Sequence, residues 1–123
     1  MPNIRFIFSA LMNNQDIQLD LLRKLESNPE YTQRELSKEM GVSLGKVNYC
    51  IRKLTEKGLI KITNFKQNPN KIGYFYLLTP KGIDEKARLT ISFLKRKVIE
   101  YEILKKEINE LQLESEEMTN KKR

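Results

Sequence analysis

The sequence predicts a mainly α-helical fold with one small β-hairpin. Apolar residues recur in several stretches at positions i, i+3, i+4 and i+7, which is the period of a helix with one buried face. One stretch, 59–78, instead alternates apolar and polar residues around a turn-forming segment, which predicts two paired strands. The chain has 123 residues, 39% hydrophobic and 32% charged, and this suits one globular domain plus one long additional element.

Two helices are predicted at the start of the chain. The first covers 3–12, where the apolar residues at helical spacing are Ile4, Ile7, Phe8 and Leu11. The segment 13–16 interrupts it, and Asp16 is placed to cap the next helix. That second helix buries Ile17, Leu21, Leu22 and Leu25, and ends at 27–30.

Two further helices are predicted to meet across a tight turn. Thr32 and Glu35 form a capping-box pattern at the start of a short helix, and Gly41 ends it as a left-handed C-cap. Ser43 caps the following helix, which runs to Lys57 before Gly58. Its inward face carries Val47, Cys50, Ile51 and Leu54. A short helix, a glycine turn and a second amphipathic helix form a helix-turn-helix pattern.

The hairpin and a long helix complete the predicted chain. Residues 59–65 and 74–78 are the expected strands, and 66–73 is the turn segment of a wing. Thr79 as cap and Pro80 as first residue then begin a helix to Met118, about 58 Å long. Its apolar residues follow a nearly heptad spacing with one slip: Ala87, Ile91, Leu94, Val98, Tyr101, Leu104, Ile108 and Leu111.

The net charge of +7 is matched by a single stretch of the chain. Residues 43–81 contain eight Lys or Arg residues and one acidic residue, Glu56, so they alone carry +7. Residues 83–123 contain ten basic and nine acidic residues, so they are almost neutral. A cationic helix-turn-helix and wing favour an anionic partner.

Several classes of function are disfavoured by the composition. The chain has no histidine and one cysteine, so we expect no metal site, no cofactor and no internal disulfide, which fits a reducing compartment. No glycine-rich phosphate loop or evident pair of catalytic carboxylates occurs, so we expect no enzyme. The apolar run 6–12 is too short to span a bilayer or to form a signal peptide. We therefore expect a cytoplasmic protein without a membrane partner.

The stretch LSKEMGVSLGKVNYCIRKLTEKGLIK, followed by a hairpin and LLTPKG, resembles the DNA-binding core of MarR-type winged helix-turn-helix regulators. The resemblance covers about residues 16–82, and VSLGKVNYCIRKLTEKGLI and LTPKG are its most specific parts. The following stretch KGIDEKARLTISFLKRKVIEYE resembles a small branch of that family found beside exopolysaccharide gene clusters. The resemblance implies a homodimer that binds a pseudo-palindromic double-stranded DNA operator, with recognition helices in successive major grooves.

The candidate DNA-binding residues lie on three segments. On helix 43–57, Asn48 suits an adenine edge, Arg52 suits guanine, and Gly45 permits close approach of the backbone. The resemblance also places Ser43 there, and the start of the preceding helix can bind a phosphate. In the wing, Asn70-Lys71-Ile72 replaces the family's Asp-x-Arg pattern, so we expect lysine–phosphate contacts. The full set is Thr32, Gln33, Ser43, Gly45, Lys46, Asn48, Tyr49, Arg52, Lys53, Lys66, Gln67, Asn70 and Lys71.

The apolar seam of the long helix predicts self-association. We define this seam as Ile91, Leu94, Val98, Tyr101, Leu104, Ile108 and Leu111. It suits either a dimeric coiled coil, parallel or antiparallel, or a helix folded back on its own domain, and we favour the dimer. We accordingly expect a winged helix-turn-helix DNA-binding domain over 1–82 and a coiled-coil-like dimerisation helix over 83–123.

The sequence therefore predicts a sequence-specific, double-stranded DNA-binding transcription regulator that acts as a homodimer, with exopolysaccharide genes as its expected target. Its small-molecule effector is unknown. The main alternative is a winged-helix scaffold that binds other proteins without specific DNA affinity. RNA binding would require exposed aromatic residues, for which Tyr49, Tyr74 and Tyr76 are available.

Overall fold

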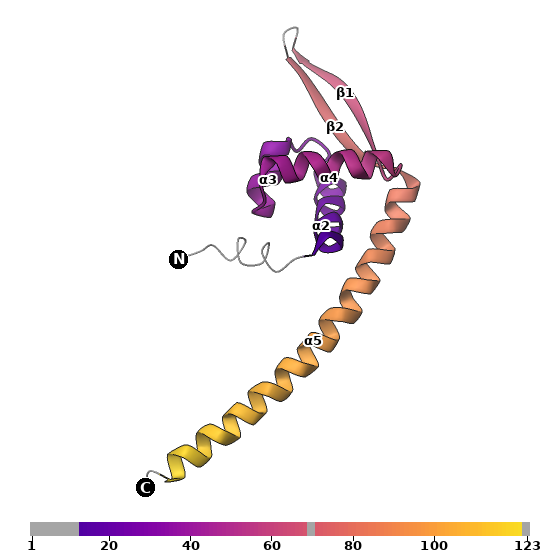
Figure 1. Ribbon diagram of the computed structural model, residues 1–123. Coiled ribbons are helices and arrows are strands. Elements are labelled where there is room, and N and C mark those ends of the chain that lie inside the picture. The colour runs from indigo at the N-terminus through magenta and orange to yellow at the C-terminus, as the bar shows by residue number, and fades with distance from the viewer. Residues whose placement is uncertain (1–12, 69–70, 122–123) are drawn as a thin grey trace. The chain divides into compact units, whose positions relative to one another are not determined.

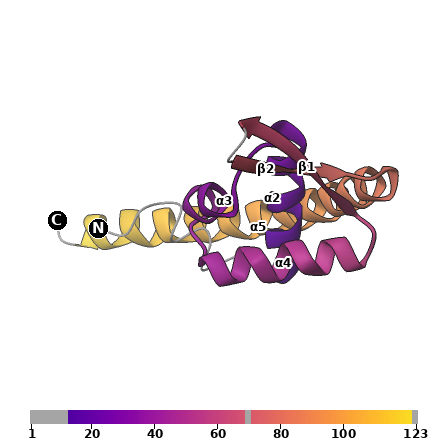
Figure 2. The same ribbon diagram turned by 90° about the horizontal axis from the view of Figure 1, so that it is seen from above.

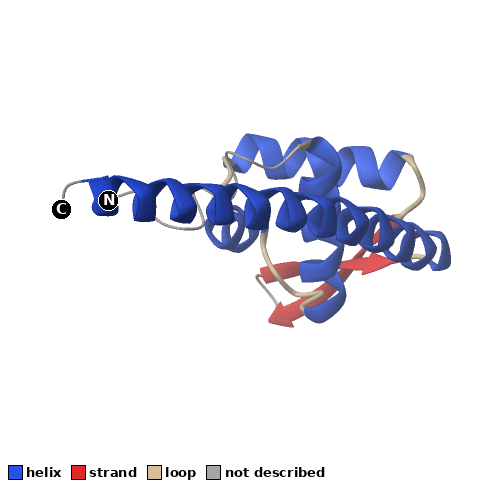
Figure 3. Cartoon of the chain, turned by 90° about the horizontal axis from the view of Figure 1, so that it is seen from below, coloured by secondary structure: helices blue, strands red, loops and turns tan. Residues whose placement is uncertain are grey.

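The computed structural model describes residues 13–68 and 71–121, apart from the side chains of 65–68 and 71–72 (Figure 1). The predicted helix over 3–12 lies outside the described residues. The elements are α2 (Asn14–Ser27), α3 (Gln33–Met40), α4 (Leu44–Glu56), β1 (Ile60–Asn68), β2 (Lys71–Leu78) and α5 (Pro80–Lys121). The predicted mainly helical fold is confirmed, and in the described part strands form only the hairpin (Figure 3).

The chain divides into two compact units between Thr90 and Ile91. The first unit holds the helix-turn-helix, the hairpin and the first turns of α5, and the second consists of the rest of α5. The predicted boundary after residue 82 separates a DNA-binding part from a dimerisation part, and this division by function stays a prediction.

The start of α2 differs from the prediction. Asn13, and not Asp16, is the N-cap: the Asn13 side-chain oxygen accepts a hydrogen bond from the Asp16 amide at 2.9 Å. The Asp16 carboxylate in turn accepts one from the Asn13 amide at 3.4 Å, which completes a capping box. Asp16 occupies the acidic third position of that box because its carboxylate can reach back to the amide of the cap.

The core of the first unit lies between the three short helices. Leu21, Leu22 and Leu25 of α2 and Leu36 of α3 are fully buried, and the inward residues of α4 are buried beside them. Burying each leucine contributes roughly 1.5–3 kcal/mol. This core fixes which face of α4 remains in solvent.

The turn between α3 and α4 agrees with the prediction. Gly41 has a φ of 67° and is the left-handed C-cap of α3, a conformation that costs glycine little. The Ser37 hydroxyl donates to the Val42 carbonyl at 2.5 Å, which holds the turn closed. Ser43 then caps α4, because its hydroxyl accepts from the Lys46 amide at 3.1 Å.

The hairpin is longer and its turn shorter than predicted. The strands are antiparallel, and Asn68 pairs with Lys71, with an irregularity between Lys66 and Asn68. The segment 66–73 was expected to be the turn of the wing. A two-stranded ribbon has solvent on both sides near its tip, so polar residues can continue its strands there.

The alternation of apolar and polar residues in β1 continues past the part of the strand that is buried. Ile60 and Ile62 point to the same side of the strand, and Ile60 is buried while Ile62 is 42% exposed. Of the hairpin side chains that the structure describes, those of Ile60 and Tyr76 are buried. Strand β2 is attached to the segment between α2 and α3 at Tyr76, whose amide donates to the Pro29 carbonyl at 3.0 Å.

The first turns of α5 are fastened to the segment that follows α4. The Thr79 hydroxyl donates to the Gly58 carbonyl at 2.6 Å and accepts from the Gly82 amide at 3.1 Å, so the predicted cap is confirmed. The Thr79 amide donates to the Leu59 carbonyl at 3.0 Å. Further along, Lys86 forms an ion pair with Glu26 of α2 at 2.9 Å.

The second unit is a single stretch of helix whose apolar side chains face solvent. All seven residues of the seam are exposed in the isolated chain. Opposite-charge pairs such as Lys97 and Glu100, at 3.0 Å, lie along the same helix. Among the described residues, no helix has the length and apolar character needed to cross a bilayer.

Candidate nucleic-acid interface

The exposed side of α4 is a polar and cationic surface. Figure 2 shows α4 along one side of the first unit, with α2, α3 and the hairpin on its other side. The exposed residues are Gly45, Asn48, Tyr49 and Arg52, flanked by the half-buried Lys46 and Lys53. We call these six residues the α4 face. The first turn of α4 contains no acidic residue, so no carboxylate opposes an approaching phosphate there.

Two lysines flank Tyr49 on this face. The Lys46 ammonium lies 5.7 Å and the Lys53 ammonium 5.6 Å from the centre of the tyrosine ring. Each contact contributes about 0.5–1 kcal/mol at an exposed site. Lys46 also donates to the Asn14 side chain at 3.2 Å, and Lys53 pairs with Glu56 at 3.4 Å. The two cations are therefore held beside the ring and stay accessible to an anion.

The start of α3 lies next to the α4 face. The Thr32 hydroxyl caps α3 by accepting from the Glu35 amide at 3.1 Å. The next residue, Gln33, is half-buried and accepts a hydrogen bond from the Asn48 side chain at 3.2 Å. The side-chain amide of Gln33 in turn donates to the Tyr76 hydroxyl at 3.4 Å. We call Asn48, Gln33 and Tyr76 the amide relay.

Most of the sequence-predicted interface is brought together on one surface. Gly45 has open space where a side chain would project, as close approach of a ligand requires. Ser43, by contrast, uses its hydroxyl in the helix cap. Asn70 and the side chains of Lys66, Gln67 and Lys71 lie outside the described residues, so their contacts stay predictions, as does DNA binding by the whole set.

Tyr76 was missed as a member of the site. The sequence places it in a strand whose alternate residues are buried, and it is only 7% exposed. Its hydroxyl nevertheless accepts a hydrogen bond from the side chain of Gln33, which lies 43 positions earlier in the chain and contacts the α4 face. No local pattern indicates a contact over that separation.

Cys50 lies beneath the α4 face and belongs to the core, as predicted. Burial raises the pKa of the Cys50 thiol above its ordinary value, and the nearby Lys46 opposes this effect only in part. A raised pKa means that less thiolate is present at any pH below it, and the thiolate is the reactive form.

We therefore expect the folded protein to resist alkylation at Cys50. At about pH 8 a thiol reagent should react much more slowly with the native chain than with free cysteine. Complete reaction should follow the addition of denaturant, and a time course of absorbance measures both rates. Equal rates before and after unfolding would contradict the buried position of this thiol.

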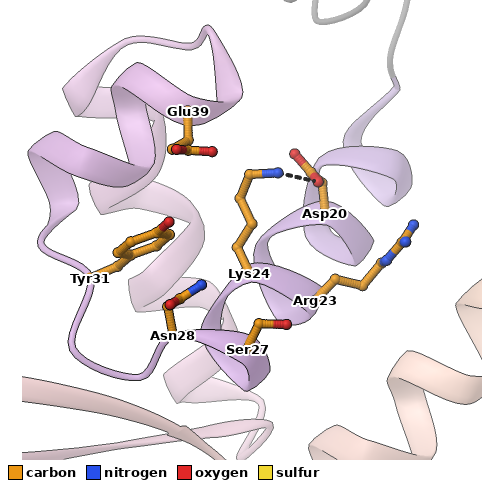
Figure 4. Close-up of a pocket in the computed structure, with 7 residues that line it drawn as sticks. All are labelled: Asp20, Arg23, Lys24, Ser27, Asn28, Tyr31 and Glu39. Carbon is orange, nitrogen blue, oxygen red and sulfur yellow. Dashed lines mark hydrogen bonds and ion pairs between the residues drawn. The ribbon is translucent and has the colours of Figure 1, made fainter.

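A separate polar hollow lies between α2 and α3 (Figure 4). Its volume is about 330 Å³, and Lys24 pairs with Asp20, one turn earlier on α2, at 2.8 Å. The remaining lining residues are Arg23, Ser27, Asn28, Tyr31 and Glu39. Sites for small organic ligands are usually lined by apolar side chains, so we assign no ligand to this hollow. Within the described ranges, no three His, Cys, Asp or Glu residues are grouped as a metal site would require.

A helix-turn-helix followed by an antiparallel hairpin is the winged helix-turn-helix fold, and the comparisons with known proteins agree. The family described as winged helix-turn-helix DNA-binding matches residues 14–61. Among curated proteins, the HTH-type transcriptional regulator Ptr1 of Methanocaldococcus jannaschii is 38% identical over 58 residues. That match covers 47% of this chain and 39% of Ptr1, so the chain spans well under half of that relative.

Solved structures share the fold at low sequence identity. The PcaV transcriptional regulator from Streptomyces coelicolor matches with a TM-score of 0.59 and 17% identity, over 77% of this chain and 71% of that one. The zinc-dependent MarR family transcriptional regulator AdcR matches with a TM-score of 0.52 and 21% identity, over 76% of this chain and 61% of that one. These similarities establish the winged helix-turn-helix fold of this chain.

Proposed function

We propose that this protein is a transcription regulator that binds a specific double-stranded DNA sequence. The observation that carries the proposal is the α4 face: an exposed helix surface whose polar side chains are able to hydrogen-bond to bases, bordered by cations. The major groove admits an α-helix, and such side chains distinguish base pairs there. The family match over residues 14–61 and the similarity to Ptr1 support the same function.

We propose that the protein acts as a homodimer through the seam of α5. Tyr101, Leu104, Lys105 and Ile108 surround a surface hollow of about 180 Å³ on the helix. Four residues at this spacing form the hole that receives a side chain from a facing helix in a coiled coil. A two-fold dimer would place its recognition helices about 34 Å apart, one turn of duplex, on a pseudo-palindromic operator.

The finer assignment rests on the family resemblance. We infer a MarR-type regulator, which the fold shared with AdcR supports. The resemblance of residues 81–102 suggests control of an exopolysaccharide gene cluster. We propose that the protein acts in the cytoplasm. The wing, 66–73, then contributes phosphate contacts through Lys66 and Lys71, and those contacts carry no sequence information.

The first experiment measures fluorescence anisotropy of the full chain on DNA upstream of its own gene and on a scrambled duplex, at two salt concentrations. A preference of about a thousandfold or more supports a specific operator. Equal, strongly salt-dependent binding to both duplexes would contradict specific recognition at that site. Failure to bind either would favour the protein-interaction scaffold.

Arg52→Ala should relax sequence preference. Arg52 is exposed on the α4 face, and losing one bidentate contact to a base costs about 1–3 kcal/mol of discrimination. The matched control is Lys71→Ala in the wing, which should weaken binding to all duplexes alike. It should also reduce the slope of affinity against salt concentration by about the contribution of one phosphate contact. Unchanged affinity and preference for Arg52→Ala would exclude Arg52 from the interface.

A further inference from the structure

The amide relay restricts what Asn48 can offer to a ligand. Asn48 donates one of its two side-chain N–H groups to the Gln33 oxygen at 3.2 Å. The described residues give the Asn48 oxygen no hydrogen bond, and the side chain is exposed. One acceptor and one N–H donor therefore remain for a partner.

The Gln33 amide has a hydrogen-bond partner at each of its two ends. An amide can present its oxygen or its nitrogen to a neighbour, and the two ends differ in hydrogen bonding. In the structure the Gln33 nitrogen donates to the Tyr76 hydroxyl at 3.4 Å, and the Gln33 oxygen accepts from the Asn48 side chain at 3.2 Å. Tyr76 is buried, and its backbone amide is bound to Pro29, so the far end of the relay is anchored.

We propose that Gln33 is a positioning residue that makes Asn48 select adenine at one base pair of each half-site. In the major groove adenine presents an acceptor and a donor, N7 and the N6 amino group. The remaining oxygen and N–H of Asn48 match that pair. Guanine presents two acceptors, N7 and O6, and pairing with both would require both N–H groups, one of which is bound to Gln33. This inference rests on the proposed DNA-binding function.

The same geometry predicts how the base preference changes when Gln33 is replaced. Without the Gln33 oxygen, the amide of Asn48 is free to turn and to donate both N–H groups to guanine. Removing the polar atoms of Gln33 should therefore reduce discrimination between adenine and guanine. A side chain needed only for folding would change stability and affinity without this selective effect.

The test is a binding selection from a random duplex pool, using the full-length protein, followed by sequencing of the bound DNA. Asn48→Ala identifies the base pair that depends on Asn48. Gln33→Met keeps the length of the side chain but removes its polar atoms. Gln33→Glu keeps an oxygen that accepts from Asn48, and Gln15→Met is a matched control at an exposed position of α2.

We expect an adenine at the Asn48-dependent position in the wild-type selection. Gln33→Met should lower its preference over guanine about tenfold, which corresponds to ~1.4 kcal/mol. Gln33→Glu should bind all DNA more weakly because of its charge but retain the adenine preference, and Gln15→Met should match the wild type. Thermal unfolding of each variant verifies that the fold is kept.

Three outcomes would overturn the inference, and they are distinguishable. An Asn48-dependent base other than adenine would refute the match of hydrogen-bonding groups. An adenine preference that Gln33→Met leaves intact would refute the positioning role. If the wild type enriches no sequence, the proposed specific recognition itself fails, and this inference fails with it.

Discussion

Gly82→Ala is expected to destabilise the first unit by about 3 kcal/mol or more, which exceeds the usual cost of a surface substitution. Gly82 lies in the first turns of α5, where a Cβ atom would stand 2.0 Å from the Leu59 carbonyl oxygen and 3.0 Å from its carbon. Those atoms are backbone and cannot rotate away. The same oxygen accepts the hydrogen bond from the Thr79 amide that begins α5.

The consequence is either displacement of α5 or loss of its attachment. Leu59 is buried, so its carbonyl cannot retreat without disturbing the core beneath it. Thermal unfolding followed by circular dichroism measures the effect, with an expected fall in melting temperature of about 10–20 °C. A variant that melts with the wild type would show that α5 does not approach Leu59 in solution.

Gly45→Ala provides the matched control for this substitution. Gly45 also lies in a helix, but nothing stands within 4 Å of an added Cβ atom. Replacing a helical glycine by alanine stabilises by about 0.5–1 kcal/mol. Because Gly45 belongs to the α4 face, the same change should reduce DNA affinity while it raises stability. The two glycines thus separate a requirement of the fold from a requirement of binding.

The elements that sequence reasoning placed correctly depend on short-range rules. Caps at Ser43 and Thr79 and the left-handed Gly41 are each determined by hydrogen bonds within a few positions. A periodic apolar stripe likewise determined which face of α4 is buried. These are local consequences of residue type, so a single sequence contains them.

The elements that it misplaced depend on contacts across the fold. The alternation of β1 predicted a strand, but it contains no information on how far the core extends along that strand, where Ile60 is buried and Ile62 is exposed. Turn-forming residues suggested a turn over 66–73, but strand pairing continues into this segment. The contact between Gln33 and Tyr76 joins two segments whose juxtaposition only the packed core determines.

The second large effect is expected from charges in the seam of α5. In the double variant Leu104→Glu and Ile108→Glu, two residues that border the hollow beside Tyr101 become acidic. Burying unpaired carboxylates in an apolar interface costs several kcal/mol, which a coiled-coil pair cannot offset. We expect the wild type to sediment as a dimer and this variant as a monomer, with DNA affinity reduced to the nonspecific level.

The same helix contains a charge-matched control. Ile99 and Ile103 are 61% and 56% exposed, much as Leu104 and Ile108 are at 54% and 46%. Each lies five positions before its counterpart, which is about 140° around an α-helix. Ile99→Glu with Ile103→Glu therefore adds the same negative charge on a different face, and we expect it to leave the dimer and operator binding intact.

The comparison between the two double variants decides how α5 contributes to binding. General repulsion between added carboxylates and phosphate would weaken both variants equally, because their charges are identical. Loss of a dimer interface would affect only the seam variant and would reduce affinity together with sedimentation coefficient. If the seam variant remains dimeric, the interface lies elsewhere. If both variants become monomeric, the helix is covered on both faces, as in an assembly of more than two helices.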